Sequence, residues 1–273
     1  MKANALRIQR ISTNVGAEIQ NVDLAIPLGA EAVRTIRQAL VDHGVIFFRD
    51  QSLTSEQYTA FASYFGRATR PDSGILGALA GSDVIAEVRK EEARGRNVGG
   101  SWHTDQVYRK APSWGTMLLG RTVPDQGGDT LFASMAAAYD ALSDGLKSTL
   151  RTLRAVHSNA GVQARMKTGR EPAPEVTHPV VIKHPESGRL ILYVSPGYTM
   201  RFEGWTEAES RPLLEYLFQH AQHPEFACRF HWNVGSLAFW DNYQTWHFAV
   251  NDYDAGARVM HRIVVESVPF APG

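Results

Sequence analysis

Hydrophobic positions recur along this chain with two periods, one typical of helices and one of short strands. Residues 30–40 carry apolar side chains at helical spacing and are followed by His43-Gly44, where the glycine can cap the helix. Residues 54–65 repeat the pattern after a Thr-Ser start suited to an N-cap. A third amphipathic helix is predicted over residues 207–220.

Short runs rich in β-branched and aromatic residues predict strands elsewhere in the chain. These runs occupy residues 6–8, 17–19, 45–48, 83–88, 176–182, 190–194, 228–232, 237–240 and 259–265. Many short strands with a few helices outside them predict a mainly β fold with flanking helices, a jelly roll of two antiparallel sheets. Residues 67–100 are glycine-rich, and both a lid and a mobile surface excursion are compatible with that pattern.

The composition excludes several classes of protein. The 273 residues hold 28 Lys+Arg and 28 Asp+Glu, a balance that argues against a nucleic-acid binder. The chain shows neither a signal-peptide pattern nor an apolar run of membrane-spanning length, so we expect a cytoplasmic protein without membrane contact. The single cysteine, Cys228, rules out an internal disulfide. Without repeats or low-complexity linkers, residues 1–273 are expected to form a single domain.

The segment Trp102-His103-Thr104-Asp105 carries the most chemical information. In an extended segment, side chains two positions apart project to the same side, so His103 and Asp105 can offer a nitrogen and an oxygen to one cation. A distant third ligand would complete the two-histidine, one-carboxylate set that suits non-haem Fe(II) oxygenases. Because a hydrogen-bonded pair at a strand end has the same pattern, the motif alone leaves both interpretations open.

A second group of candidates lies nearer the C-terminus. Among ten histidines, His247 stands out within the aromatic segment 239–249. The even spacing of Arg258 and Arg262 would place both side chains on one face of a strand, with His261 on the other. Two inward guanidinium groups require anionic partners, since an unpaired buried cation is costly, so they would imply bound carboxylates or similar anions. A solvated strand face is the alternative.

Taken in order, these motifs resemble the taurine dioxygenase and 2,4-dichlorophenoxyacetate dioxygenase family of Fe(II)/2-oxoglutarate-dependent oxygenases. The resemblance extends from residue 16 to residue 262, and its most specific blocks are residues 102–105, 127–132, 178–181 and 240–262. It implies a double-stranded β-helix, which is a cupin-like jelly roll. It also implies an enzyme that uses Fe(2+), 2-oxoglutarate and O2 to oxidise a C–H bond, with release of succinate and CO2.

The resemblance further implies roles for individual residues. His103, Asp105 and His247 match the residues that bind iron in the family. Thr130 matches a threonine whose hydroxyl binds 2-oxoglutarate. Arg258 matches the arginine that pairs with the distal carboxylate of that cosubstrate, a task for which a guanidinium fork is well shaped.

The resemblance also has implications for the molecule whose C–H bond is oxidised, called the substrate below. Arg262 matches the arginine that grips the substrate's sulfonate in the taurine enzyme, so we expect a small organic anion (a carboxylate, sulfonate or sulfate ester) with an apolar body. Alternatively, Arg262 braces the proximal carboxylate of 2-oxoglutarate or a structural acid. Arg70, near the position of a substrate-binding histidine in the taurine enzyme, is a second candidate for substrate contact. Arg70 and Gln106 both depart from the pattern of the taurine enzyme.

Two other classes of function stay open at this point. One is a cupin-like metal-dependent hydrolase or isomerase that uses zinc or manganese, and the other is a non-catalytic small-molecule sensor. The presence of every proposed metal ligand and both arginines weighs against the sensor. We expect the loops at residues 67–100 and 158–174 to choose the substrate, and the family resemblance suggests a homo-oligomer, a dimer or a tetramer.

Overall fold

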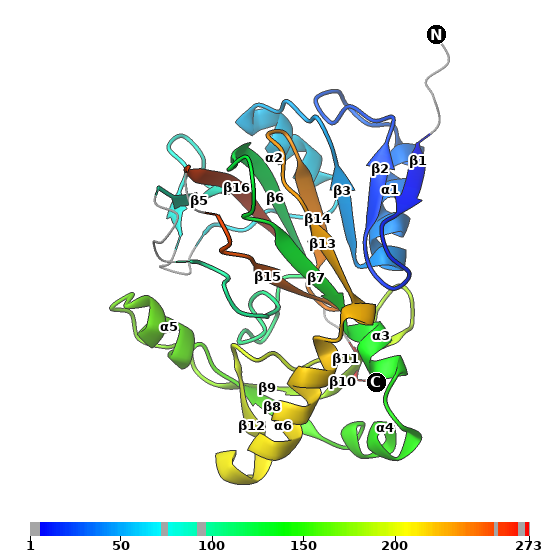
Figure 1. Ribbon diagram of the computed structural model, residues 1–273, viewed down its shortest axis with the longest axis vertical. Helices are drawn as coiled ribbons and strands as arrows, with labels where there is room; N and C mark the ends of the chain where they lie inside the picture. The colour runs from blue at the N-terminus through cyan, green and yellow to red at the C-terminus, as the bar shows by residue number, and fades with distance from the viewer. Residues whose placement is uncertain (1–5, 72–75, 92–96, 254–255, 267–270, 273) are drawn as a thin grey trace.

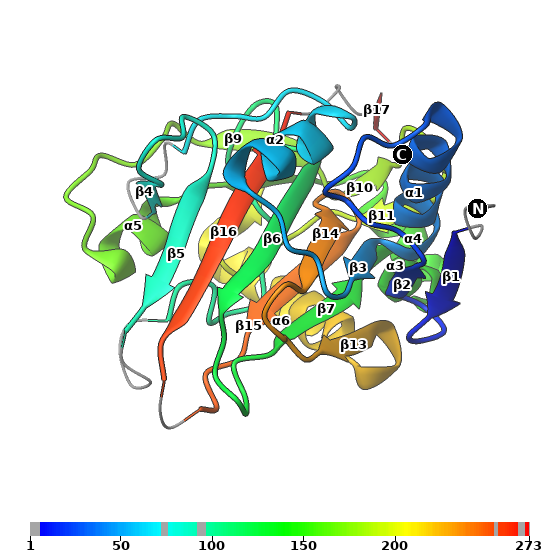
Figure 2. The same ribbon diagram turned by 90° about the horizontal axis from the view of Figure 1, so that it is seen from above.

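The computed structural model describes residues 6–71, 76–91, 97–253, 256–266 and 271–272 (Figure 1). Its largest element is an eight-stranded sheet. The strands are β1 (Arg7–Arg10), β2 (Ala17–Gln20), β3 (Val45–Phe48), β4 (Gly77–Ala78), β5 (Ala86–Lys90), β6 (Gly115–Thr122), β14 (Leu237–Asp241) and β16 (Arg258–Val265). They lie in the order β1-β2-β3-β14-β6-β16-β5-β4, and every neighbouring pair except β2 and β3 is antiparallel (Figure 2).

Three smaller sheets of three strands each complete the β structure. Their strands are β7 (Thr130–Ser134), β8 (Arg154–His157), β9 (Val176–Pro179), β10 (Val181–Lys183), β11 (Leu190–Leu192), β12 (Thr199–Phe202), β13 (Ala227–Phe230), β15 (Thr245–Ala249) and β17 (Ala271–Pro272). The sheet orders are β13-β7-β15, β12-β8-β9 and β11-β10-β17. Strands β14 and β15 follow each other closely in the chain but belong to different sheets, so the turn between them joins the large sheet to a small one. This architecture confirms the predicted mainly β jelly roll.

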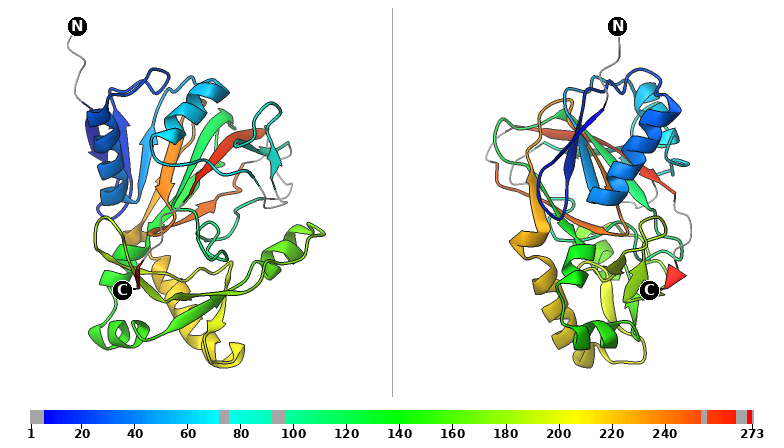
Figure 3. Two further views of the ribbon diagram at one scale, coloured as in Figure 1. Left: turned by 180° about the vertical axis from the view of Figure 1, so that it is seen from behind. Right: turned by 90° about the vertical axis from the view of Figure 1, so that its right-hand side faces the viewer.

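The helices cover the outside of the sheets. They are α1 (Ala30–His43), α2 (Ser55–Ser63), α3 (Met135–Asp140), α4 (Asp144–Leu150), α5 (Ala160–Met166) and α6 (Glu207–Ala221), with a 3-10 turn at Pro224–Phe226. Helices α1 and α2 lie on the outer face of the large sheet, whereas α5 stands out at the side of the molecule (Figures 2 and 3). Among the described residues, none of the helices has the length and apolar content needed to cross a bilayer.

Local signals in the sequence explain where several elements begin and end. Gly44 ends α1 at a φ of 73°, a left-handed value that glycine adopts at low cost, and its N–H donates to the carbonyl of Leu40. Helix α2 begins with a capping box, in which Thr54 and Gln57 bond each other's backbone N–H groups. All four residues of β3 are buried, as a continuous apolar run predicts for a central strand.

Other elements differ from the sequence prediction. The strand expected over 176–182 is divided into β9 and β10, and the one expected over 83–88 is shifted to β5. No strand was predicted over β6, which contains Gly115 and Gly120, a residue type more common in turns than in strands. In the structure a Cβ atom on Gly115 would lie 2.8 Å from the ring of Phe239, so the glycine permits close packing of β6 on β14.

The glycine-rich stretch at residues 67–100 is only partly described. It contains β4 and the whole of β5, which together form the far edge of the large sheet. Residues 72–75 and 92–96 lie outside the described residues. That this stretch acts as a lid therefore stays a prediction.

Candidate active site

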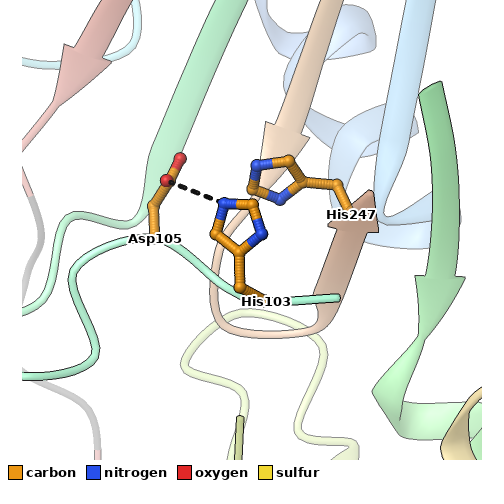
Figure 4. A group of neighbouring side chains, drawn as sticks. All are labelled: His103, Asp105 and His247. Carbon is orange, nitrogen blue, oxygen red and sulfur yellow. Dashed lines mark ion pairs between the residues drawn. The ribbon is translucent and has the colours of Figure 1, made fainter. Parts of the chain in front are cut away.

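His103, Asp105 and His247 come from two segments that are far apart in the sequence. His247 lies on β15, whereas His103 and Asp105 lie in the connection between β5 and β6. The backbones of His103 and His247 exchange two N–H···O bonds of 3.1 and 2.8 Å, which form an isolated antiparallel bridge. One possible ligand atom from each of the three side chains lies within 4.8 Å of the others, and the side chains point toward one another (Figure 4).

The two imidazoles have nitrogens available for a metal ion. Nδ1 of His103 lies 2.7 Å from the carbonyl oxygen of Ser101, which can only accept, so Nδ1 carries the proton and Nε2 presents its lone pair. Nδ1 of His247 is buried without a hydrogen-bond partner in the structure. Burial lowers the pKa of both histidines, that of His247 well below its usual range. Both rings are therefore neutral near pH 7, which is the form that binds metals.

Asp105 is held as a carboxylate by its neighbours. Its Oδ2 accepts hydrogen bonds from Oγ1 of Thr116 at 2.8 Å and pairs with Nη2 of Arg262 at 2.6 Å. Burial opposes ionisation, but the charge of Arg262 and its hydrogen bond outweigh burial and keep the pKa of Asp105 well below its usual range. Oδ1 lies 3.9 Å from Nε2 of His103, on the side of the histidines. Two neutral imidazoles and one ionised carboxylate fit a divalent iron ion.

Three other histidines of the chain have partners within the protein. Nε2 of His178 lies 2.9 Å from the carbonyl oxygen of Arg109, and Nε2 of His184 lies 2.7 Å from Oδ2 of Asp241. Nδ1 of His261 accepts a hydrogen bond from Nε of Arg121 at 3.0 Å. His261 does not line the cavity described below, in agreement with the alternation expected along β16.

A cavity of about 390 Å³ opens beside the three candidate ligands. Thr130 lines it from β7, and Arg258 and Arg262 line it from β16. The two arginines therefore share one face of their strand, as their spacing predicts. Apolar side chains, including Leu118, Val162 and Met166, supply much of the remaining wall.

Arg258 is buried, and its guanidinium is incompletely bonded. Its Nε donates to the carbonyl oxygen of Gly128 at 3.1 Å, whereas Nη2 is buried without a hydrogen-bond partner. Burial lowers the pKa of Arg258 to about 10, so the group stays charged near pH 7. No ion pair links Arg258 to a carboxylate within the part of the chain that the structure describes. An incoming carboxylate would satisfy this buried cation.

Thr130 can add a second contact to such a carboxylate. Its Oγ1 accepts a hydrogen bond from Nε1 of Trp232 at 3.0 Å, so its hydroxyl hydrogen can be donated into the cavity.

The turn at Gly127 and Gly128 precedes Thr130 and has φ values of 74° and 67°. A Cβ atom on Gly127 would lie 2.7 Å from the backbone oxygen of Asp252, which explains why glycine occupies this position.

Arg70 is not part of this site. Its side chain is 78% exposed and pairs with Asp83 at 3.1 Å, and it does not line the cavity. The sequence prediction that Arg70 contacts the substrate is therefore not supported by its placement. The prediction relied on nearness to a family position, whereas the chain leaving α2 directs this side chain into solvent.

Sequence reasoning missed other residues that line the cavity. Arg165 and two neighbours approach it from α5, and Tyr108 and Tyr198 border it with ring centroids 5.1 Å apart. We expected residues 158–174, which include α5, to influence the choice of substrate. That expectation named no individual side chain. Gln106, noted as a departure from the taurine enzyme, also lines the cavity and has a left-handed φ of 57°.

Comparison with known proteins identifies the family to which the chain belongs. The model of the family described as "Taurine catabolism dioxygenase TauD, TfdA family" matches residues 7–264. The chain belongs to this family. The resemblance of its sequence motifs to the taurine and 2,4-dichlorophenoxyacetate dioxygenases is thereby confirmed.

Individual members of the TauD/TfdA family match over most of the chain. The α-ketoglutarate-dependent sulfate ester dioxygenase of Pseudomonas putida is 33% identical over 95% of this chain and 89% of its own. The α-ketoglutarate-dependent 2,4-dichlorophenoxyacetate dioxygenase of Cupriavidus pinatubonensis is 34% identical over 89% of this chain and 91% of its own. A solved taurine dioxygenase from Burkholderia xenovorans superimposes with a TM-score of 0.86 at 36% identity, covering 98% of this chain and 93% of that one.

Proposed function

We propose that this protein is an Fe(II)- and 2-oxoglutarate-dependent dioxygenase that hydroxylates a small organic anion and releases succinate and CO2. One observation carries this proposal: a single cavity unites two neutral histidines and an ionised aspartate with Arg258, a buried guanidinium that has no acidic partner among the residues the structure describes. The first group suits ferrous iron, and the second suits the far carboxylate of a dicarboxylic acid. Hydrolase and sensor functions lose support, since the family and its named relatives are dioxygenases.

Different residues of the cavity would bind the iron and the 2-oxoglutarate. His103, Asp105 and His247 would hold the iron, whereas Arg258 and Thr130 would bind 2-oxoglutarate. When bound, iron and 2-oxoglutarate supply the oxidising chemistry, in which O2 converts 2-oxoglutarate to succinate and CO2 and one oxygen atom enters a C–H bond. This chemistry resides in the cofactors, and the protein contributes binding, orientation and exclusion of water.

The surroundings of Asp105 support its proposed role as an oriented metal ligand. Thr116 and Arg262 both bind Oδ2, so the carboxylate is fixed in rotation and Oδ1 is directed toward the histidines. Ser101 fixes the ring of His103 in the same way through Nδ1. Such outer contacts hold ligands in place before a metal arrives, which reduces the conformational entropy lost on binding.

The charge of the cavity supports an anionic substrate. Among the described residues, its lining contains three arginines, Arg165, Arg258 and Arg262, but a single carboxylate, that of Asp105. A concave site with an excess of cationic groups attracts anions. Apolar lining residues favour an apolar body on the same molecule. The names of two relatives refer to sulfate esters and to 2,4-dichlorophenoxyacetate, which are acids of this kind.

Detection of succinate tests the proposed reaction. The purified protein would be supplied with ferrous iron, 2-oxoglutarate and O2, together with alkyl sulfates, alkylsulfonates or phenoxyacetates. We expect at least one acid to stimulate succinate formation and to be hydroxylated. Binding of acids without any succinate, or ester hydrolysis that does not need 2-oxoglutarate, would overturn the proposal.

We also propose that residues 1–273 form one catalytic domain that assembles as a dimer or tetramer in the cytoplasm. The match of one family model to residues 7–264 supports the single domain. Light scattering coupled to size-exclusion chromatography measures the assembly. A monomer at micromolar concentration would contradict the proposed oligomer.

A further inference from the structure

Helix α5 forms one wall of the cavity. Val162, Arg165 and Met166 all line it, and their spacing of three and four positions places them on one face of the helix. Val162 and Met166 are buried, whereas Arg165 is exposed and borders the cavity where it meets solvent. The helix therefore presents an apolar surface to the cavity with one guanidinium at its edge.

The three arginines of the cavity differ in what they already bind. Arg262 pairs with Asp105, and Arg258 lies deep in the site with Nε bonded to the carbonyl oxygen of Gly128. Arg165 has neither a hydrogen bond nor an ion pair within the described ranges of the chain. Of the three guanidinium groups, that of Arg165 is thus the one with no partner and with direct access from solvent.

We propose that Arg165 binds the anionic group of the oxidised substrate and thereby selects acids over neutral molecules. This inference rests on the proposed function and gives the acid group of the substrate a contact on α5 in addition to Arg262, whose Nη2 already pairs with Asp105. The acid group of the substrate lies at α5, and its apolar body extends along Val162 and Met166 toward His103 and Asp105.

The aromatic side chains of the cavity are compatible with this orientation. The ring of Tyr198 lies 6.4 Å from that of His103 and 5.1 Å from that of Tyr108, measured between centroids, and both tyrosines line the cavity. They form an apolar surface beside the candidate iron ligands. A molecule with one acidic end and one apolar end would place its C–H bonds there when its acid reaches Arg165.

Calorimetric titration of the holoenzyme tests the assignment. Hexyl sulfate, hexanesulfonate and phenoxyacetate would be titrated anaerobically into the protein loaded with Fe(2+) and 2-oxoglutarate, and hexanol and phenoxyacetamide would serve as neutral counterparts. In Arg165→Gln we expect the Kd of the best-bound acid to rise about tenfold. This is the lower end of the range for loss of a charge-assisted hydrogen bond, because Arg165 is exposed to solvent. Arg165→Lys should recover part of the lost affinity. Added NaCl should narrow the difference in Kd between the wild type and Arg165→Gln, because salt screens the charge of Arg165.

Matched controls separate this inference from the proposed function. Lys167→Gln, at the exposed end of the same helix, should bind the acids like the wild type. The 2-oxoglutarate requirement for succinate formation should be unchanged in Arg165→Gln. An unchanged Kd for the acids in Arg165→Gln overturns the inference and leaves the dioxygenase intact. If no acid binds more tightly than its neutral counterpart, the anionic substrate and the role of Arg165 both fail, and absence of succinate formation overturns the dioxygenase itself.

Discussion

Nη2 of Arg262 lies 2.6 Å from Oδ2 of Asp105, and the two side chains are 16% and 11% exposed. The pair joins β16 of the large sheet to the segment that carries the first two candidate metal ligands. Because the guanidinium binds one carboxylate oxygen, the other stays directed toward the histidines. Arg262 thus both lines the cavity and keeps Asp105 ionised and oriented.

Replacement of Arg262 should therefore weaken metal binding. In Arg262→Gln, Asp105 loses its charged partner, so its pKa should rise and its carboxylate should become mobile. Breaking a buried ion pair by removal of one partner costs about 3–5 kcal/mol, and we expect a loss of this size in the free energy of unfolding of the metal-free protein. Ferrous affinity, measured by calorimetry under anaerobic conditions, should fall most at low pH. Wild-type affinity in this variant would contradict the role of Arg262 in positioning Asp105.

The three candidate ligands should be individually required for iron. His103→Ala, Asp105→Ala and His247→Ala should each abolish ferrous binding and succinate formation, since the described residues contain a single group of this geometry. The matched control is His261→Ala, whose side chain bonds Arg121 away from the cavity and should retain iron. Any one of the three variants that binds iron like the wild type would be removed from the ligand set.

Arg258 should control the requirement for 2-oxoglutarate. In Arg258→Gln the charge-assisted contact to the distal carboxylate is lost, and the KM for 2-oxoglutarate should rise about thirtyfold or more, corresponding to about 2–5 kcal/mol. Thr130→Val should raise it less, since a neutral hydrogen bond contributes about 1 kcal/mol. Succinate formation at varied 2-oxoglutarate measures both. An unchanged KM in Arg258→Gln would shift the assignment to another arginine of the cavity.

His157 should make stability depend on pH. The side chain is fully buried, with Nδ1 3.0 Å from Oγ1 of Thr199 and Nε2 unbonded. Burial lowers the pKa of His157 to about 3, so between about pH 6.5 and pH 3 the unfolded chain takes up a proton that the folded protein excludes. Between about pH 6.5 and pH 3, this residue therefore lowers the free energy of unfolding by up to about 1.4 kcal/mol for each pH unit of acidification.

Urea unfolding at pH 7.5 and pH 5 measures this effect. His157→Gln should be less stable than the wild type at pH 7.5 but should lose less stability on acidification. The exposed His223 offers the control, because His223→Gln should keep the pH dependence of the wild type. Equal pH dependence in His157→Gln and the wild type would show that His157 is protonated within the folded protein.

The amino-acid sequence by itself determined those features whose cause is local. Gly44 ends α1, the Thr54 capping box begins α2, and the apolar run of β3 is buried, since each depends on neighbouring residues. The even spacing of Arg258 and Arg262 also predicted a shared face, because side chains alternate along a strand. The family motifs then indicated the three candidate ligands of a metal ion.

Only the tertiary structure decided which of these side chains meet. The bridge between His103 and His247 depends on how the connection after β5 crosses a strand of another sheet, and no local pattern encodes that crossing. The same holds for the pairing of Arg262 with Asp105 and for the approach of Arg165 to the cavity from α5. Long-range contacts follow from the order and register of the strands, which are selected by burial over the whole chain and not by any one segment.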